Sequence, residues 1–193
     1  MDKEKLLAFL RNESLIPASV LNEIAGQFQY KIIVKNQFLL AEGKISDDYL
    51  FLTKGVMRAF ARDVKGNEVT TNFCLPGQVV FEVSSFFNRT RSKENIQALT
   101  DCEGWYITYK QLNDMFHALP QFREFGRSVL VKGFASLKGR MLATITETAE
   151  ERYANLLRES PEIFQCAPLK NIASYLGITD TSLSRIRKEF SKK

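Results

Sequence analysis

Histidine is nearly absent from the sequence, since the 193 residues include only one, His117. A cupin-like metal centre needs several histidines and carboxylates that converge on one ion, so this class is excluded. Glu82 has no evident acid–base partner, and no Ser/His/Asp or Cys/His set can be assembled. We therefore expect no metal, no catalytic residues and no enzymatic activity.

Cysteines and long apolar runs are also scarce. Cys74, Cys102 and Cys166 lie far apart and form no CxxC motif, so we expect free structural thiols and no iron–sulfur site. No run of ~18 apolar residues is available for a membrane span. The charged, amphipathic start, MDKEKLLAFLRNE, lacks the apolar core of a signal peptide. These absences favour a cytoplasmic protein that does not enter membranes.

Acidic residues are few at the C-terminal end of the chain. The whole sequence contains 27 Lys and Arg against 22 Asp and Glu, which gives a net charge of +5. Residues 168–193 contain six basic and two acidic residues, so this segment carries +4 of that total. A concentrated positive charge of this kind indicates an anionic partner.

The same segment has the pattern of a helix-turn-helix. Ile172, Ala173 and Leu176 fall at helical spacing and form one apolar stripe. Gly177 then ends the first helix, because glycine takes the left-handed conformation without a Cβ penalty. Thr179 is a good N-cap for a second helix. A small residue at Ala173 also allows two helices joined by a short turn to cross closely.

The second predicted helix has two different faces. Its inward residues are Leu183, Ile186 and Phe190, and Ile178 and Leu183 are placed as a hydrophobic staple around the cap. The outward face carries hydroxyl groups and cations, namely Thr181, Ser182, Arg185 and Lys188. Such groups suit base edges and phosphates in a major groove. An ordinary helical hairpin with a solvated basic face is the alternative, although cap, staple and charge all favour DNA binding.

This pattern assigns a role to each polar side chain of the predicted DNA-binding surface. We expect Arg185 to contact guanine O6 and N7, with Thr181 and Ser182 selecting neighbouring bases. We expect phosphate contacts from a second group, whose members are Thr179, Arg187, Lys188 and Lys170. The predicted partner is therefore double-stranded DNA.

The middle of the chain has the pattern of a β-barrel or sandwich. Short runs rich in Val, Ile, Phe and Tyr recur every 8–12 residues or so, which is typical of antiparallel sheets. Lys65-Gly66-Asn67 predicts a hairpin turn between two of them. The predicted strands are Tyr30–Val34, Phe38–Ala41, Tyr49–Leu52, Val56–Ala61, Val69–Leu75, Asn95–Leu99 and Trp105–Thr108.

Helical segments flank this region. Residues 2–28 read as two short helices, with Pro17 opening the second. The stretch FEVSSFFNRTRSKE, residues 81–94, predicts a short helical turn followed by a basic loop. The segments up to residue 120 are assigned to one effector domain, 1–120.

A long helix is predicted over Gln121–Thr146, because apolar residues recur there at spacings of three and four. Its apolar face is broad enough to contact both the barrel and another chain, so we expect a homodimer. A helix buried within one monomer is the alternative. The predicted interface consists of Phe122, Val129, Leu130, Phe134, Leu137 and Met141. We assign 121–147 to this dimerisation helix and linker, and 148–193 to the DNA-binding domain.

This order of segments resembles the Crp/Fnr family of bacterial transcription regulators over nearly the whole chain. The resemblance rests on Pro76-Gly77, Phe81-Glu82-Val83, the long helix, Ala149–Tyr153 and IASYLGITDTSLSRIRKEF. It implies an α+β fold: an N-terminal antiparallel β-roll or jelly-roll barrel, a long dimerisation helix and a winged-helix-like helix-turn-helix domain. It also implies a homodimer on a two-fold operator, with RNA polymerase and a small-molecule effector as further candidate partners.

The family's barrel is similar to cyclic-nucleotide-binding domains, where a Gly-Glu-Leu segment binds ribose and an Arg-Ser/Thr-Ala segment binds phosphate. Glu82 matches the glutamate, but Phe81 replaces its glycine and Ser92 stands at the arginine position. Serine cannot form a charge-assisted fork with phosphate. The candidate effector residues are Glu82, Val83, Ser84, Arg89, Arg91 and Ser92.

Two further readings of the effector domain follow from the same departures. We expect no cofactor, and we expect the effector to be an unknown small molecule or none. One alternative is a cyclic AMP-responsive regulator in which Arg89 or Arg91 replaces the missing phosphate-binding arginine. A ligand-binding barrel without specific DNA binding is the other. Iron–sulfur sensing would need clustered cysteines before Cys74, and the lone His117 favours a structural role over haem ligation.

Overall fold

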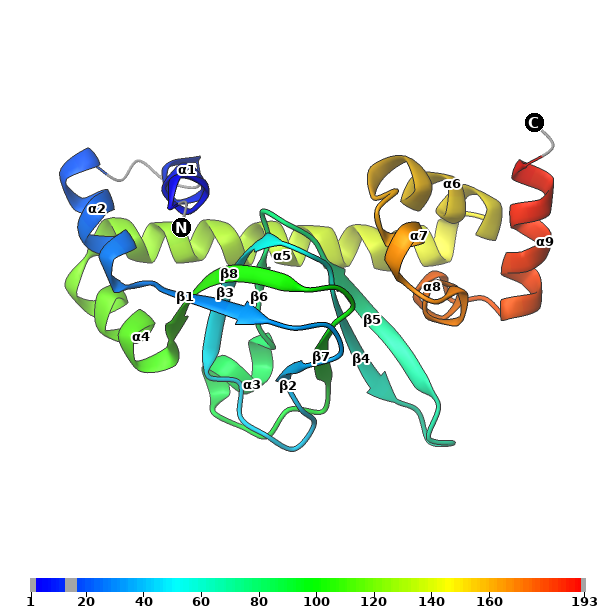
Figure 1. Ribbon diagram of the computed structural model, residues 1–193, viewed down its shortest axis with the longest axis horizontal. Helices are drawn as coiled ribbons and strands as arrows, with labels where there is room; N and C mark the ends of the chain where they lie inside the picture. The colour runs from blue at the N-terminus through cyan, green and yellow to red at the C-terminus, as the bar shows by residue number, and fades with distance from the viewer. Residues whose placement is uncertain (1–2, 13–16, 192–193) are drawn as a thin grey trace.

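The computed structural model describes residues 3–12 and 17–191. Helices and strands follow the predicted order, with helices at both ends and strands between them (Figure 1). The elements are α1 (Glu4–Asn12), α2 (Ala18–Gln27), β1 (Gln29–Ile33), β2 (Phe38–Leu40), β3 (Asp48–Lys54), β4 (Met57–Arg62), β5 (Glu68–Cys74), β6 (Val79–Val80), α3 (Val83–Asn88), β7 (Asn95–Ala98), β8 (Cys102–Thr108), α4 (Tyr109–Ala118), α5 (Pro120–Thr146), α6 (Ala149–Glu159), α7 (Ile163–Cys166), α8 (Leu169–Leu176) and α9 (Asp180–Phe190).

The strands form two antiparallel four-stranded sheets. One has the order β1-β8-β3-β6 and the other the order β2-β7-β4-β5. Alternate residues of each sheet face inward and fill the barrel with aliphatic side chains, among them Leu50, Leu52, Met57 and Ile96. The β4–β5 hairpin turns where predicted, with Gly66 at φ +82° and the Asp63 amide donating to the Asn67 carbonyl at 2.9 Å.

All seven predicted strands are present, and their ends shift by no more than three residues. The sequence reading missed β6, whose two residues, Val79 and Val80, pair with Phe51 and Leu50 of β3. A two-residue strand is too short to show a periodicity of two, so the pattern carried no signal for it. The short helix α3 lies within the predicted interruption at residues 81–94.

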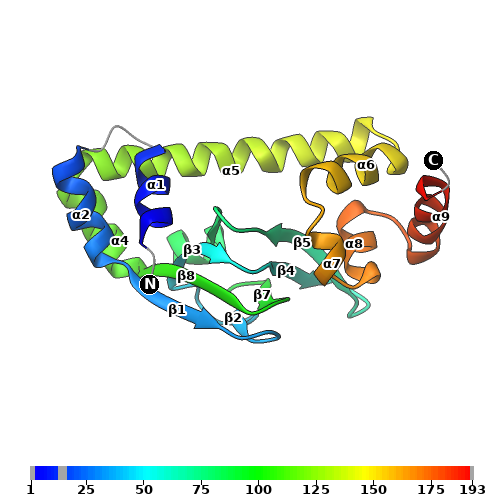
Figure 2. The same ribbon diagram turned by 45° about the horizontal axis from the view of Figure 1, so that its top comes forward.

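The helix α5 runs along the whole length of the molecule and has two unlike halves (Figures 1 and 2). Its first turns are buried with α1, α2 and α4 in an aromatic cluster, where the Phe125 ring lies 5.4 Å from that of Phe9. From Leu130 onward its large apolar side chains are exposed. The alternative of a helix buried within one chain therefore holds only for the first turns.

Phe122 has to be removed from the predicted dimer interface. Its side chain is fully buried in its own chain, with its ring centroid 5.3 Å from those of both Phe116 and Phe125. No surface of this ring remains for a partner. The periodicity of the helix could not distinguish the buried turns from the exposed ones, because both follow the same spacing of three and four.

The C-terminal helices α6–α9 pack around a third cluster at the other end of α5. The resemblance implied a winged-helix-like unit, but the described residues beyond Thr146 include only helices and no strand. The wing is therefore not formed in the described part of the chain. Among the described residues, no helix is both long and apolar enough to span a membrane.

Candidate nucleic-acid interface and effector site

The turn between α8 and α9 forms as its residues predict. Gly177 has φ +70°, and its amide donates to the carbonyls of Ala173 and Ser174 at the end of α8. The Thr179 hydroxyl then accepts from the Ser182 amide at 3.2 Å and caps α9. Ala173 is buried, as expected for the residue at which two helices cross closely.

The helix α9 lies at one end of the molecule, beside the C-terminus, as Figure 2 shows. Its polar side chains are largely exposed. Thr181, Arg185, Arg187 and Lys188 are exposed and Ser182 is half-buried, while Leu183 and Ile186 on the opposite face are fully buried. Phe190 packs inward, with its ring 5.0 Å from that of Tyr153. The predicted division of the helix into two faces is therefore present.

Two predicted DNA contacts already have partners within the chain. The Arg185 guanidinium lies 3.5 Å from the Glu150 carboxylate, and its side chain is 68% exposed. An exposed ion pair of this kind contributes little, so a phosphate or base edge can replace it. The Thr179 hydroxyl is engaged as the N-cap and also lies 3.0 Å from the Ser182 hydroxyl. Lys170, on α8, is exposed.

Arg152 connects α6 to the helix-turn-helix and was not singled out as a functional residue by the sequence reading. Its guanidinium donates to the Leu176 carbonyl from Nε at 3.2 Å and from Nη2 at 3.0 Å. Nη1 donates to the Glu147 carbonyl at 2.6 Å. These bonds satisfy carbonyls at the ends of α8 and α5, which have no partner within their helices. The pattern of apolar residues carries no signal for such contacts.

The candidate effector residues are largely engaged in holding their own loop together. The Glu82 carboxylate caps α3 by accepting from the amides of Ser84 and Ser85 at 3.0 and 2.6 Å. The Arg89 guanidinium pairs with Asp47 at 2.7 Å and donates to the Ser46 carbonyl at 2.9 Å. Both charged groups therefore have intramolecular partners where the resemblance implies ligand contacts.

The remaining effector candidates do not form a phosphate site. Ser92 is buried, and its hydroxyl donates to the Glu94 carbonyl at 2.8 Å. Burial raises the pKa of the Glu94 carboxyl. Arg91 is exposed and makes a long contact of 3.4 Å from Nη1 to the Gly43 carbonyl. Val83 and Ser84 are exposed on α3. A buried serine and a nearby carboxyl give an anion little to bind.

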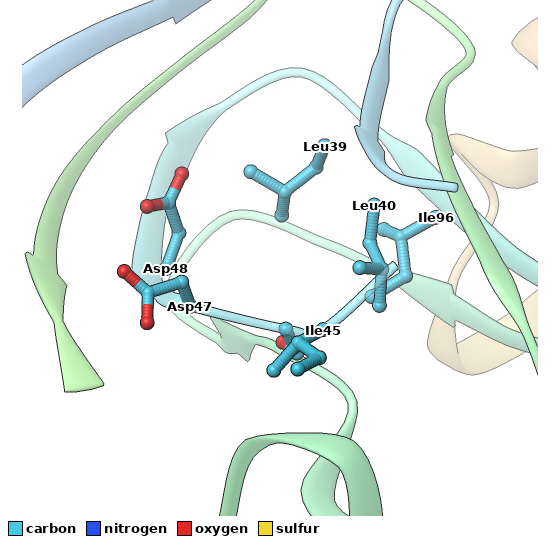
Figure 3. A pocket seen from close by; sticks show the side chains of 7 residues that line it. Leu39, Leu40, Ile45, Asp47, Asp48 and Ile96 are labelled. Carbon is cyan, nitrogen blue, oxygen red and sulfur yellow. The ribbon is translucent and has the colours of Figure 1, made fainter. Parts of the chain in front are cut away.

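A small cavity opens beside this loop, as Figure 3 shows. It has a volume of ≈ 120 Å³ and is lined by apolar side chains and by two carboxylates. Asp47 pairs with Arg89 and Asp48 with Lys31, so neither carboxylate is available as a free charge. None of the six effector candidates lines it. The lining residues are Leu39, Leu40, Ile45, Ser46, Asp47, Asp48 and Ile96.

The three cysteines lie at buried or half-buried positions. All three are free thiols, and burial raises the pKa of Cys74 to about 12. Burial also raises the pKa of Cys102 and of Cys166. A thiol with a raised pKa is a poor nucleophile and metal ligand. Within the described residues, no group of three or more His, Cys, Asp or Glu side chains is placed to hold a metal ion.

Comparison with known proteins gives consistent results across sequence and structure. Residues 31–118 match the family model for the cyclic nucleotide-binding domain. The transcriptional activator protein Anr of Pseudomonas protegens is 25% identical over 171 residues, which cover 82% of this chain and 68% of Anr. The fumarate and nitrate reduction regulatory protein of Escherichia coli (strain K12) is 25% identical over 174 residues, covering 84% of this chain and 68% of that protein.

Solved structures share the fold over almost the full chain. FixK2 from Bradyrhizobium japonicum superposes with a TM-score of 0.72 at 19% identity, covering 86% of this chain and 85% of FixK2. The c-di-GMP responsive global regulator CLP from Xanthomonas campestris has a TM-score of 0.70 at 15% identity, with coverage of 91% and 92%.

A cyclic-nucleotide-binding-like barrel, a long helix and a C-terminal helix-turn-helix together define a class of transcription regulators. In sequence and in fold the chain is similar to the Crp/Fnr family of that class. The family resemblance stated from the sequence is confirmed, and the matched relatives are named as regulatory proteins.

Replacement of Gly177 by alanine tests the turn directly. A Cβ at Gly177 would meet no atom within 4 Å, so the cost is that of the left-handed conformation alone. We expect Gly177→Ala to lower the free energy of unfolding by roughly 1–2 kcal/mol in chemical denaturation. The control is Gly139→Ala in α5, where a Cβ also meets nothing. It should raise stability by up to about 1 kcal/mol, because the position is helical. Equal effects of both variants would contradict this account of the turn.

Proposed function

We propose that the protein is a homodimeric, sequence-specific DNA-binding regulator that reads a two-fold operator with α9. The observation that carries this proposal is the capped and largely exposed polar face of α9, opposite a buried apolar face. A helix built in this way presents hydroxyls and cations to a major groove without rearrangement. In this proposal, residues 1–120, 121–147 and 148–193 act as effector domain, dimerisation segment and DNA-binding domain.

The exposed half of α5 supports pairing with a second copy. Large apolar side chains follow one another along this half, and the Phe134 side chain is 69% exposed. A contiguous apolar stripe of this length on a helix is the usual sign of a partner surface. Two copies paired here would place their α9 helices in successive major grooves, ~34 Å apart. The stripe consists of Leu130, Phe134, Leu137, Met141 and Ile145, with Val129 half-buried at its start.

We also propose that the barrel does not bind cyclic AMP. The support is that Arg89 is engaged with Asp47 and the Ser46 carbonyl, and that Ser92 is buried at the position implied for the phosphate arginine. An anion would have to displace the Asp47 carboxylate before it could reach Arg89. The effector, if one exists, is therefore of another chemical class.

Substitutions on α9 test DNA recognition. We expect Arg185→Ala to weaken binding to the selected operator by roughly 1–3 kcal/mol and to relax preference at one base pair per half-site. Lys188→Ala should weaken binding about evenly on all sequences and reduce the salt slope by about one. The measurement is selection of duplex DNA from a random pool, followed by titration at several salt concentrations.

The alternative of a ligand-binding barrel without specific DNA binding makes the opposite prediction. If wild-type protein enriched no sequence from the pool, that alternative would gain support and this proposal would fail. An even loss over all sequences for Arg185→Ala would reassign that residue to phosphate contact only.

A charge placed in the apolar stripe tests the dimer. Phe134→Asp should convert the dimer to a monomer in sedimentation velocity, because a carboxylate would be desolvated at the interface. The matched control is Ala135→Asp, which adds the same charge at an exposed position next to the stripe. A wild-type protein that sediments as a monomer at all concentrations would overturn this part of the proposal.

Calorimetric titration with cyclic AMP tests the effector site. We expect no saturable heat at millimolar nucleotide, because Glu82 and Arg89 already have partners within the chain. Saturable binding that disappears in Arg89→Ala, but persists in Arg91→Ala, would show that Arg89 replaces the missing arginine. The cyclic AMP-responsive alternative would then be correct.

A further inference from the structure

The helix-turn-helix is packed directly on the outer face of the barrel. Three barrel residues, Val56, Phe73 and Leu99, belong to the same buried cluster as the core of the C-terminal helices. The Phe73 ring of β5 meets the Tyr175 ring of α8 edge-on at 5.1 Å. In both views α8 lies against β5, while α9 lies farther out (Figures 1 and 2). Barrel and helix-turn-helix therefore share one continuous core.

A polar network crosses this contact between Thr70 of β5 and Ser174 of α8. The Thr70 amide donates to the Ser174 hydroxyl at 3.1 Å, and the two hydroxyl oxygens are 2.9 Å apart. The Ser174 hydroxyl also lies 3.0 Å from the Asn171 carbonyl, which gives its proton a second acceptor. Because Thr70 is buried, these bonds have fixed partners rather than exchangeable water.

Arg58 of β4 lies behind Thr70 and is 3% exposed. Its Nε donates to the Thr70 hydroxyl at 2.9 Å, and its Nη1 pairs with Glu68 at 2.7 Å. The guanidinium also lies 4.3 Å from the centre of the Phe60 ring. A buried charge with fixed hydrogen bonds specifies one arrangement of its surroundings, because removing any partner leaves the charge uncompensated. This network therefore favours one setting of α8 on β5.

Arg140 of α5 contacts both β5 and α8 at the same junction. Its Nη1 donates to the Thr71 carbonyl of β5, and its guanidinium lies 4.9 Å from the centre of the Tyr175 ring. Tyr175 is thus in contact with Phe73 of the barrel and with Arg140 of the long helix. We call Arg58, Thr70, Phe73, Arg140, Ser174 and Tyr175 the α8 seam.

We propose that the α8 seam positions the DNA-reading helix and thereby sets the spacing between half-sites that the dimer accepts. This inference rests on the proposed function. The support is a chain of fixed contacts: α9 is held to α8 by the Gly177 turn, α8 to β5 by Thr70 and Ser174, and β5 to α5 by Arg140. If two copies pair along α5, each α9 lies at a set distance from the dimer axis.

The seam orders α9 without covering it. The seam uses Ser174 and Tyr175 of α8, whereas Thr181, Arg185 and Lys188 on α9 remain exposed. An inhibitory contact would bury the DNA-reading face, and this one leaves it open. The expected effect is therefore preorganisation, which lowers the entropy cost of binding two half-sites at once. Arg58, Thr70 and Ser174 are positioning residues in this account and do not contact DNA.

The test compares operators whose half-sites are moved apart or together by one and two base pairs. One base pair rotates a half-site by roughly 34° about the DNA axis, given 10–10.5 bp per turn. Wild-type protein should strongly prefer one spacing. Ser174→Ala should bind the preferred spacing about fivefold more weakly and lose a similar factor of preference over the altered spacings, as expected for one lost buried hydrogen bond.

Two variants control for general loss of stability. Ser191→Ala removes a hydroxyl that donates to the Lys188 carbonyl in the last turn of α9, and it should leave the preference for spacing unchanged. Thr70→Val removes the hydroxyl that accepts from Ser174 and from Arg58, while it keeps the side-chain shape and the Thr70 amide bond to Ser174. It should change the preference for spacing in the same direction as Ser174→Ala. Agreement between the two seam variants would locate the effect at the contact rather than in α8.

Hydrogen exchange gives a readout that needs no DNA. The Thr70 amide donates to the Ser174 side chain, so peptides covering Glu68–Cys74 should exchange faster in Ser174→Ala and not in Ser191→Ala. Unchanged exchange in Ser174→Ala would show that the contact does not hold α8, and it would overturn the inference.

The DNA measurements separate the two proposals. If wild-type protein binds no operator, the proposed function fails, while exchange still reports on the seam. If wild-type binds but Ser174→Ala keeps the full preference for spacing, the seam does not position α9. Tighter binding by Ser174→Ala would also overturn the inference, since the contact would then be inhibitory.

Discussion

The packing of the first turns of α5 into an aromatic cluster is the interaction on which the rest of the structure depends. Phe122 and Phe125 are fully buried there, with rings 5.3 Å apart. This cluster fixes the direction in which α5 leaves the barrel. The direction decides where the exposed apolar stripe lies and where α6 begins. Because α5 continues as one helix from Pro120 to Thr146, rings buried at one end influence the position of groups at its other end.

The barrel has the family's fold, but two charged groups of its candidate effector site already have partners within the chain. Glu82 caps α3 and Arg89 pairs with Asp47. A site whose donors and acceptors already have partners gains little by binding a charged ligand, because each new bond replaces an existing one. Contact between barrel and helix-turn-helix is, in contrast, extensive and partly polar. The described structure therefore has fixed polar contacts both at the candidate ligand site and at the junction with α8.

Periodicity and cap residues predicted most of the fold, whereas contacts between distant segments left no trace in the sequence pattern. Gly177 and Thr179 act locally, so their roles could be read directly. Phe122 was misassigned because an apolar residue that meets its own core and one that meets a partner follow the same spacing. Arg58 and Ser174 belong to elements far apart in the chain. Their pairing depends on how α8 docks, and one sequence carries no signal for that.

The contact between Phe9 and Phe125 also has a consequence for synthesis of the chain. Their rings lie 5.4 Å apart, yet Phe125 is made roughly 100 residues after Phe9. At ~5–20 residues per second, α1 emerges about 5–20 s before its binding partner exists. During that interval α1 can pack on only part of its native surroundings, such as α2 and the Phe51 ring of β3, which lies 4.3 Å from the Phe9 ring. Complete burial of Leu6 and Leu10 therefore waits for the first turns of α5.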